Sequence, residues 1–392
     1  MSFFSGYWFF VYLILLLIPA VVLGLLEKPL RLYRLGTTAF FIYMIYRDTP
    51  KQLLYLLVYA AGAAYLVKIY AWLRAKYGKN PYIYGHTVAL AVLPLILSKW
   101  SGVHGGTLFS FLGISYICFR VVQVIVETYD GVITEIPAVQ FLEFLLFFPA
   151  LSSGPIDRSR RFAEDDGRAW SRDEYMELLN GGVYKLVLGA FYKIVCSALF
   201  YKLLTGVFAE RYQPLYLVGY AYVYGLYMFF DFAGYSAMAV GTSYILGVRM
   251  PDNFNKPFLS VDIKDFWNRW HITLSSWFRD FIFTRFILDS VRRKRFKTRL
   301  GGAAAGLMLN MLIMGVWHGP YAHYIAYGLY HGVLLAVTEV YQKKSAFYRK
   351  NKKKRWYLLV SWFLTLNAVM LGFLIFSGHV QEVWQAARVH FW

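Results

Sequence analysis

The sequence predicts an all-α polytopic membrane protein. Of its 392 residues, 58% are hydrophobic and 20% are aromatic. Only 16% are charged, whereas soluble domains carry about 25% charged residues. The apolar residues gather in runs long enough to cross a bilayer, and short polar links separate these runs. We therefore expect a single membrane domain whose many tryptophans and tyrosines lie at the bilayer interfaces.

The apolar runs, taken in chain order, predict roughly ten to twelve membrane segments at about 20 residues per span. In the N-terminal part, spans are expected at 7–26, 53–70, 82–97 and 108–126, with a short candidate re-entrant segment at 35–46. Later spans are expected at 182–208, 215–246, 300–317, 323–341 and 356–376.

The order of these segments suggests three parts within the one domain. Residues 1–150 hold the N-terminal spans, residues 151–342 form a core that carries the motifs described below, and residues 343–392 hold a basic loop and the last span. The core opens with the first polar stretch, 151–175, which mixes arginines with acids after a Ser-Gly-Pro turn. We expect this stretch to be a surface loop.

The net charge of +19 is explained by membrane topology. In a soluble protein such a charge would suggest a nucleic-acid partner, but here the excess of lysine and arginine lies in short loops, so no nucleic acid is expected. Two clusters without acids, 292–299 and 343–355, are predicted to be cytoplasmic. Two spans separate them, which places the link between these spans outside. The same rule predicts that both termini are extracellular.

The sequence contains no pattern that indicates a bound metal or nucleotide. Cys118 and Cys196 are the only cysteines, and both lie in apolar runs without zinc-ligand spacing. His318 and His323 flank a Gly-Pro break and share no helical face. Walker loops, GxGxxG motifs and nucleophilic-serine elbows do not occur. We therefore expect no metal and no cofactor held by the chain itself.

His318 is the leading candidate for a catalytic residue. It follows Trp317 at the end of the uncharged run 300–317, and Gly319-Pro320 cannot continue the helix. An imidazole at the end of a membrane helix can act as a general base, a metal ligand or an interfacial anchor. Ionisable groups inside membranes usually have a function.

Residues 258–287 are too charged to cross lipid and predict an amphipathic helix. At 100° per residue, one face is aromatic and apolar and the other is polar. The apolar face holds Phe266, Trp270, Leu274, Trp277 and Phe281, and the polar face holds Lys264, Asn268, His271, Ser275 and Arg279. Such a helix can lie on the cytoplasmic surface. The asparagine, histidine and serine at the centre of its polar face favour a helix that lines a wet cavity.

Two further polar residues lie inside apolar segments. Asp231, in the expected span 215–246, should pair with an arginine or tyrosine of a neighbouring segment, and this favours a structural role. His331, in the expected span 323–341, is interpreted as a packed helix residue, with a site role as the alternative.

Four motifs in order resemble the signature of the membrane-bound O-acyltransferase family. They are Asp231–Ser236, Pro251–Phe258, Phe266–Asp280, and the pair Gly315–Gly319 with Gly328–Gly332. The resemblance is close over residues 150–332, approximately. It implies an acyltransferase whose membrane helices form a ring around a central tunnel.

Two branches of that family compete. Alginate-type O-acetylases follow the tryptophan-rich helix with an Ile-Pro-Leu-Gly-Gly loop, whereas here Asp280 is followed by Phe-Ile-Phe-Thr-Arg. The compact length and the loop 153–158 resemble more closely the branch that transfers D-alanine to lipoteichoic acid in the plasma membrane of Gram-positive bacteria. A polysaccharide O-acetylase remains an alternative. A transporter of an acylated intermediate is the alternative from another class, although no internal repeat supports it.

The resemblance to the D-alanyl branch implies partners and residue roles. An acidic D-alanyl carrier protein would dock on the cytoplasmic face with its 4′-phosphopantetheine thioester, and the hydroxyl acceptor would be lipoteichoic acid or a small membrane relay protein. His318 and His271 would be catalytic. The tunnel would be lined by Asn268, Ser275, Trp267, Trp270, Asp231, Trp317 and His331, and the carrier would contact Arg292, Arg293, Lys294 and Arg295.

Overall fold

The computed structural model describes residues 4–391, except residues 104, 107, 136 and 209–212. Every regular element in the described residues is helical, which confirms the predicted all-α class. Six segments are long and apolar enough to cross a bilayer: Tyr7–Leu25, Pro50–Tyr77, Pro81–Val103, Arg172–Val207, Arg299–His318 and Arg355–Ser377. Expected spans at 108–126, 215–246 and 323–341 are helical over most of their length but are not in this set. The ring of ten to twelve helices therefore stays a prediction.

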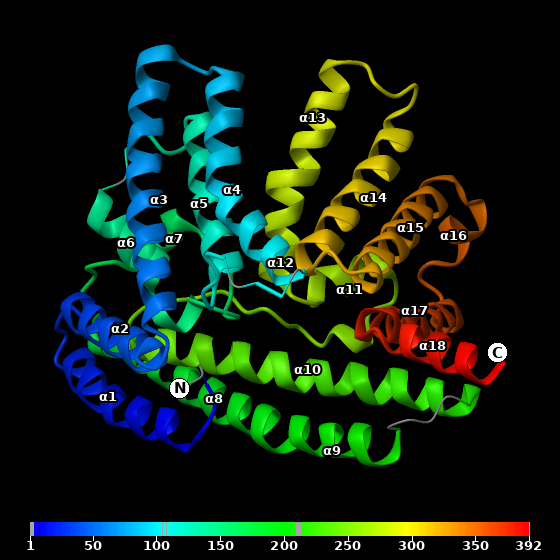
Figure 1. Cartoon of the computed structure of the whole chain (residues 1–392), viewed down its shortest axis with the longest axis horizontal. Helices are drawn as coiled ribbons and strands as arrows, with labels where there is room; N and C mark the ends of the chain where they lie inside the picture. Colours follow the sequence, from blue (N-terminus) through cyan, green and yellow to red (C-terminus); the bar gives the residue numbers. More distant parts are fainter. Residues whose placement is uncertain (1–3, 104, 107, 136, 209–212, 392) are drawn as a thin grey trace. The chain divides into compact units, whose positions relative to one another are not determined.

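The chain divides into two compact units, one formed by residues 1–191 with 234–252 and the other by 192–233 with 253–392. The first unit contains α1 (Tyr7–Leu25), α2 (Arg31–Tyr46), α3 (Pro50–Tyr77), α4 (Pro81–Val103), α5 (Ile114–Asp130), α6 (Ala138–Leu146), α7 (Ser159–Asp165) and α8 (Arg172–Ala190). Helices α3, α4 and α5 lie side by side in it (Figure 1). The division into 1–150, 151–342 and 343–392 is not tested by this arrangement.

The polar stretch 151–175 is anchored in the first unit, and the expectation of a plain surface loop is wrong. Asp157 and Asp165 are buried, with 2% and 1% of their surface exposed. Asp165 accepts hydrogen bonds from the backbone N–H and the guanidinium of Arg249. Arg161 pairs with both aspartates. Charge alternation looked like a solvated loop, but these charges neutralise one another inside the protein.

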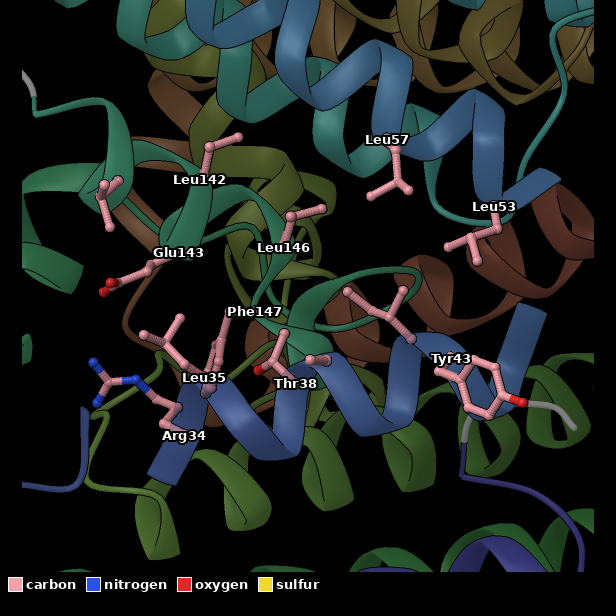
Figure 2. A pocket seen from close by; sticks show the side chains of 13 residues that line it. Arg34, Leu35, Thr38, Tyr43, Leu53, Leu57, Leu142, Glu143, Leu146 and Phe147 are labelled. Carbon is pink, nitrogen blue, oxygen red and sulfur yellow. The ribbon is translucent and has the colours of Figure 1, made fainter. Parts of the chain in front are cut away.

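The first unit also contains an apolar cavity of about 400 Å³ between α2, α3 and α6 (Figure 2). Its walls are mostly aliphatic, with Leu53 and Leu57 projecting from α3. Arg34 and Glu143 lie at its edge, where Arg34 pairs with Asp166 and Glu143 accepts hydrogen bonds from Arg31. The polar groups at the edge are therefore already paired, and none of the predicted site residues lines this cavity.

The second unit carries the sequence motifs. It contains all but the first residue of a π-helical turn at 191–196, then α9 (Ser197–Val207), the first part of α10 (Pro214–Ile245), α11 (Ile263–Arg269), α12 (Ile272–Phe278), a π-helical turn at 279–283, α13 (Thr284–Arg292), α14 (Arg299–His318), α15 (Ala322–Lys344), α16 (Ala346–Asn351), α17 (Arg355–Ser377) and α18 (His379–Phe391). Helices α13 and α14 form an antiparallel hairpin (Figure 1).

Glycines bring α14 and α15 into backbone contact. A Cβ atom on Gly315 would lie 2.5 Å from the carbonyl oxygen of Tyr324, and one on Gly328 would lie 2.5 Å from the carbonyl oxygen of Met311. Only glycine fits such an approach, which is typical of closely packed membrane helices. The contact fixes the end of α14, where His318 lies.

The predicted continuous helix over 258–287 is wrong, because the chain breaks at Trp270 and His271. His271 has φ 45° and ψ 53°, a left-handed conformation that few residues other than glycine adopt. The segment 253–255 crosses at this break. Its Asn253 carbonyl accepts from the N–H of Ile272, and the N–H of Asn255 donates to the carbonyl of Arg269. These bonds satisfy backbone groups that the interrupted helix leaves open.

Candidate active site

His318 is the last residue of α14, as predicted, and Gly319 follows as the C-cap. Its half-buried imidazole is surrounded by aromatic rings. The centroid distances are 4.6 Å to Trp317, 5.0 Å to Phe376, 5.8 Å to Tyr324 and 6.3 Å to Tyr327. These rings come from α14, α15 and α17, so the packing of three helices determines where the imidazole lies.

His271 is held by the segment that interrupts its helix. Its side chain is buried, and its Nδ1 lies 3.3 Å from Oδ1 of Asn253. The same oxygen accepts from the hydroxyl of Thr273 at 2.6 Å and from the N–H of Thr273 at 3.3 Å. A backbone N–H can only donate, so this amide atom is the acceptor and Nδ1 of His271 carries a proton. Nε2 is then the unprotonated nitrogen of the neutral ring.

Burial, together with a smaller effect from the charge of a protonated His318, lowers the pKa of His271 to about 3. His271 is therefore neutral at physiological pH.

His331 is packed among aromatic rings, as its structural interpretation predicted. Its ring is 5.3 Å from Trp267 and 4.6 Å from Tyr327, and 1% of its surface is exposed. Gly372 of α17 makes room for it, because a Cβ atom there would collide with Nε2 of His331. Tyr327 contacts both His331 and His318, so the three side chains form a continuous row.

A cavity of about 280 Å³ brings together three of the predicted tunnel residues, namely Trp267, Asn268 and Ser275. Lys264 and Arg279 line it as well, so amide, hydroxyl and charged side chains surround this cavity. His271 is not among the lining residues, because the break at Trp270 turns it away from the polar face that the periodicity gave it.

Asn310 is a cavity residue that the sequence reasoning missed. It lies on α14, lines the same cavity, and is 8% exposed. Within the described residues, its side-chain oxygen and the indole N–H of Trp267 have no hydrogen-bond partner. Unpaired buried polar atoms are costly, so these two atoms are candidates for hydrogen bonds to water or to a polar ligand in the cavity. A lone asparagine in the uncharged run 300–317 was the available signal.

Other predicted residues lie elsewhere. Trp270 packs against Phe373 at 4.9 Å and does not line the cavity. Asp231 is paired, but the expected arginine or tyrosine partner is wrong. Lys193 Nζ lies 2.5 Å from its Oδ1, and the hydroxyl of Ser197 lies 3.4 Å from the same atom.

The predicted docking arginines form a cluster around one acid at the end of α13. Arg292, Arg293 and Arg295 all contact the carboxylate of Asp289, at 3.0, 2.9 and 2.6 Å. Leu288 on the same helix is 64% exposed. The surface is therefore basic and partly apolar.

Comparison with known proteins identifies the family. The model of the membrane-bound O-acyltransferase family matches residues 41–380. The chain belongs to this family. Among its relatives, the teichoic acid D-alanyltransferase of Bacillus subtilis (strain 168) is 39% identical, with 96% of this chain and 98% of the relative covered. The teichoic acid D-alanyltransferase of Streptococcus thermophilus is also 39% identical, over 96% and 95% of the two chains.

The other branch of the membrane-bound O-acyltransferase family is represented at lower coverage. The probable alginate O-acetylase AlgI of Pseudomonas aeruginosa is 31% identical, over 71% of this chain and 51% of its own length. The predicted family is therefore confirmed, and the similarity to D-alanyltransferases extends over more of the chain.

Proposed function

We propose that this acyltransferase moves D-alanine from a carrier-protein thioester to a hydroxyl acceptor for the D-alanylation of lipoteichoic acid. Relatives named teichoic acid D-alanyltransferase match nearly the whole chain, which supports this substrate over polysaccharide acetylation. The observation that carries the chemistry is the half-buried imidazole of His318 at the end of α14, enclosed by aromatic rings from three helices.

In the proposed reaction, His318 acts as the general base. An imidazole nitrogen of His318 takes the proton of the acceptor hydroxyl while the oxygen attacks the thioester carbonyl carbon. The new C–O bond forms, the C–S bond breaks, and the pantetheine thiolate takes the proton from the His318 imidazolium. A thioester is already activated, so no covalent serine or cysteine intermediate is needed. Nε2 of His271 would accept a hydrogen bond from a reacting group or an intervening water.

The cavity lined by Asn268, Ser275 and Asn310 is proposed to hold the phosphopantetheine arm. The arm contains two amides, each of which needs one donor and one acceptor. The unpaired indole N–H of Trp267 and the unpaired side-chain oxygen of Asn310 supply one of each. Arg279 at the same cavity, whose ion pair with Asp280 is exposed to solvent, would attract the phosphate, whereas Lys264 is paired with Glu339. The arm arrives with the carrier, so the chain itself needs no resident cofactor.

The carrier is proposed to dock at Arg292, Arg293, Lys294 and Arg295. Carrier proteins of this type are acidic, so a basic surface would speed and orient their encounter. The exposed Leu288 next to these arginines would add apolar contact. Placing this surface in the cytoplasm follows from the positive-inside rule, as do extracellular termini. A ring of helices around a tunnel would connect this side with an acceptor reached from outside, either lipoteichoic acid or a small relay protein.

Transfer of D-alanine from purified carrier thioester to acceptor, catalysed by the full chain in detergent, tests the proposal. We expect His318→Ala to lower the rate by roughly 10²–10⁴-fold, the usual contribution of a general base. His86→Ala is the matched control, because His86 is exposed on α4 and its ring is hydrogen-bonded to the carbonyl of Tyr82 in the same helix.

Three results would contradict the proposal. Wild-type turnover in a folded His318→Ala protein would remove His318 as the base. Transfer of acetyl groups but not D-alanyl groups by the wild type would favour the polysaccharide O-acetylase alternative. A transporter would give no turnover in detergent, where no gradient exists.

A further inference from the structure

The two basic clusters differ in how their charges are balanced. The arginines at 292–295 share Asp289. In contrast, no basic residue of the segment 343–355 forms an ion pair within the described residues. These residues are Lys343, Lys344, Arg349, Lys350, Lys352, Lys353, Lys354 and Arg355. Eight unbalanced positive charges at the end of membrane helices attract anions strongly.

A groove of about 460 Å³ opens beside this second cluster, between α15, α16 and α17. Lys352 lines it, and the ammonium lies 5.7 Å from the ring centroid of Tyr348. Asp262 also lines it, but both of its carboxylate oxygens are already hydrogen-bonded, one capping α11 and the other accepting from the side chain of Gln342. Lys352 is the one cationic side chain that lines the groove among the described residues.

The rest of the groove is amphipathic along its length. Aromatic residues gather near Lys352, where Tyr357 donates its hydroxyl proton to Tyr341 and leaves the proton of Tyr341 for another acceptor. Further along, the walls are aliphatic, with Leu334 from α15 and Leu364 from α17. Helix α17 is long and apolar enough to cross a bilayer, and 61% of Leu364 is exposed. The groove therefore begins with a cation, continues with hydroxyl donors and aromatic rings, and ends in an alkyl wall.

We propose that this groove is a specific binding site for an anionic phospholipid. The phosphate lies against the ammonium of Lys352 and the hydroxyl of Tyr341, and one acyl chain runs along Leu334 and Leu364. Basic pockets at helix ends recognise anionic head groups in this way. An acidic protein such as the carrier would satisfy the charges but would leave the alkyl wall unfilled, which is why the lipid fits better. The proposal concerns binding and does not depend on the acyl-transfer reaction.

Native mass spectrometry of the full chain, released from detergent with added lipid, tests the site. The probes are phosphatidylglycerol, phosphatidylcholine with matched acyl chains, and glycerol phosphate without acyl chains. We expect phosphatidylglycerol to bind most tightly. Lys352→Gln should weaken its binding about fivefold, since each basic residue near a membrane surface contributes ~1 kcal/mol. Thr338→Phe, which fills the groove, should weaken both lipids without adding or removing charge.

Lys353→Gln is the matched control, because this neighbour carries the same charge but does not line the groove. Equal losses from Lys352→Gln and Lys353→Gln would overturn the proposal in favour of general surface attraction. Glycerol phosphate binding as tightly as phosphatidylglycerol would show a phosphate site without a lipid chain, and would also overturn it. Carrier binding that depends on Lys352 while lipid binding does not would assign the groove to the protein partner instead. Unchanged unfolding temperatures establish that each variant is folded.

Discussion

The side-chain oxygen of Asn253 lies 3.3 Å from Nδ1 of His271 and determines which nitrogen of that imidazole carries the proton. The oxygen is identified as an acceptor because the N–H of Thr273 donates to it. His271 also has a left-handed backbone, so both its ring and its main chain depend on the segment that contains Asn253. We interpret Asn253 as a positioning residue for His271.

Replacing Asn253 should impair turnover more than binding. Asn253→Leu removes the acceptor, and we expect a roughly 10–100-fold lower kcat, the range seen when a partner that orients a functional histidine is lost. KM for the carrier should change little. Asn253→Asp keeps the acceptor, but its charge raises the pKa of His271. Activity should therefore be recovered at high pH. As the pH falls, activity should be lost at a higher pH than in the wild type.

Thr273→Val is the control for the Asn253 variants. It removes the hydroxyl bond to the same oxygen at 2.6 Å but leaves the bond to His271 in place. An equal loss of kcat in Thr273→Val and Asn253→Leu would reduce Asn253 to a structural residue. An unshifted pH profile in Asn253→Asp would do the same.

The low pKa of His271 predicts a pH-dependent stability. Its folded-state pKa of about 3 lies below the ordinary value of 6.5, so between these values the unfolded chain binds a proton that the folded chain does not. The contribution is complete above about pH 6.5 and is lost as the pH falls. From pH 7 to pH 5 the loss should be about 2 kcal/mol at 1.36 kcal/mol per unit. His271→Gln should reduce the change in unfolding temperature between pH 7 and pH 5, and an unchanged slope would contradict the prediction.

Six of the nine expected spans coincide with helices that are long and apolar enough to cross a bilayer, because a span is a local property of composition. The run 300–317 became α14 with His318 at its end, since the Gly-Pro pair that stops the helix is adjacent in sequence. The break at His271 could not be predicted in this way. The break depends on hydrogen bonds to the segment 253–255, which lies outside the helical pattern from which the helix was predicted.

Pairing of charges shows the same limit. That Asp231 needs a partner follows from its apolar surroundings, but its partner Lys193 lies on the π-helical turn at 191–196, and the π geometry was not visible in the sequence. Asn310 was overlooked because one polar residue in an apolar run carries little signal until its neighbours are known. Helical periodicity also assigned His271 to the cavity face, and this assignment failed once the helix was interrupted.

Glycine contacts between α14 and α15 should control the placement of His318. In Gly315→Ala, the new Cβ would lie 2.5 Å from the backbone oxygen of Tyr324, which cannot move without the helix. We expect a destabilisation of about 1–3 kcal/mol, typical of overpacking, together with reduced D-alanyl transfer. The unfolding temperature and the transfer rate check this.

Gly62→Ala on α3 provides the matched control. A Cβ atom there meets nothing within 4 Å, so alanine should leave the unfolding temperature unchanged or raise it by the helix-propensity gain of up to ~1 kcal/mol. Opposite signs for the two substitutions are expected. If Gly315→Ala stabilises the protein, α14 and α15 can separate without an energetic cost. The contact between these two helices would then not determine where His318 lies.

Asn310 should contribute to substrate binding but not to the stability of the free protein. Its side-chain oxygen has no partner among the described residues, so Asn310→Leu removes an unsatisfied polar atom and should leave the unfolding temperature unchanged or higher. If this oxygen accepts a hydrogen bond from an amide of the pantetheine arm, KM for the carrier thioester should rise by about 2–10-fold, the equivalent of 0.5–1.5 kcal/mol. Steady-state kinetics and thermal unfolding of the same preparation measure both quantities.

Asn367→Leu is the counterpart, because the side-chain oxygen of Asn367 accepts a hydrogen bond from the hydroxyl of Tyr222 at 2.9 Å. Its replacement leaves that hydroxyl without its partner, so the unfolding temperature should fall while KM stays unchanged. The two asparagines should therefore show opposite patterns. If Asn310→Leu lowers the unfolding temperature and leaves KM unchanged, the oxygen of Asn310 is satisfied within the protein itself. The cavity between α11, α12 and α14 would then lose its principal acceptor for the arm.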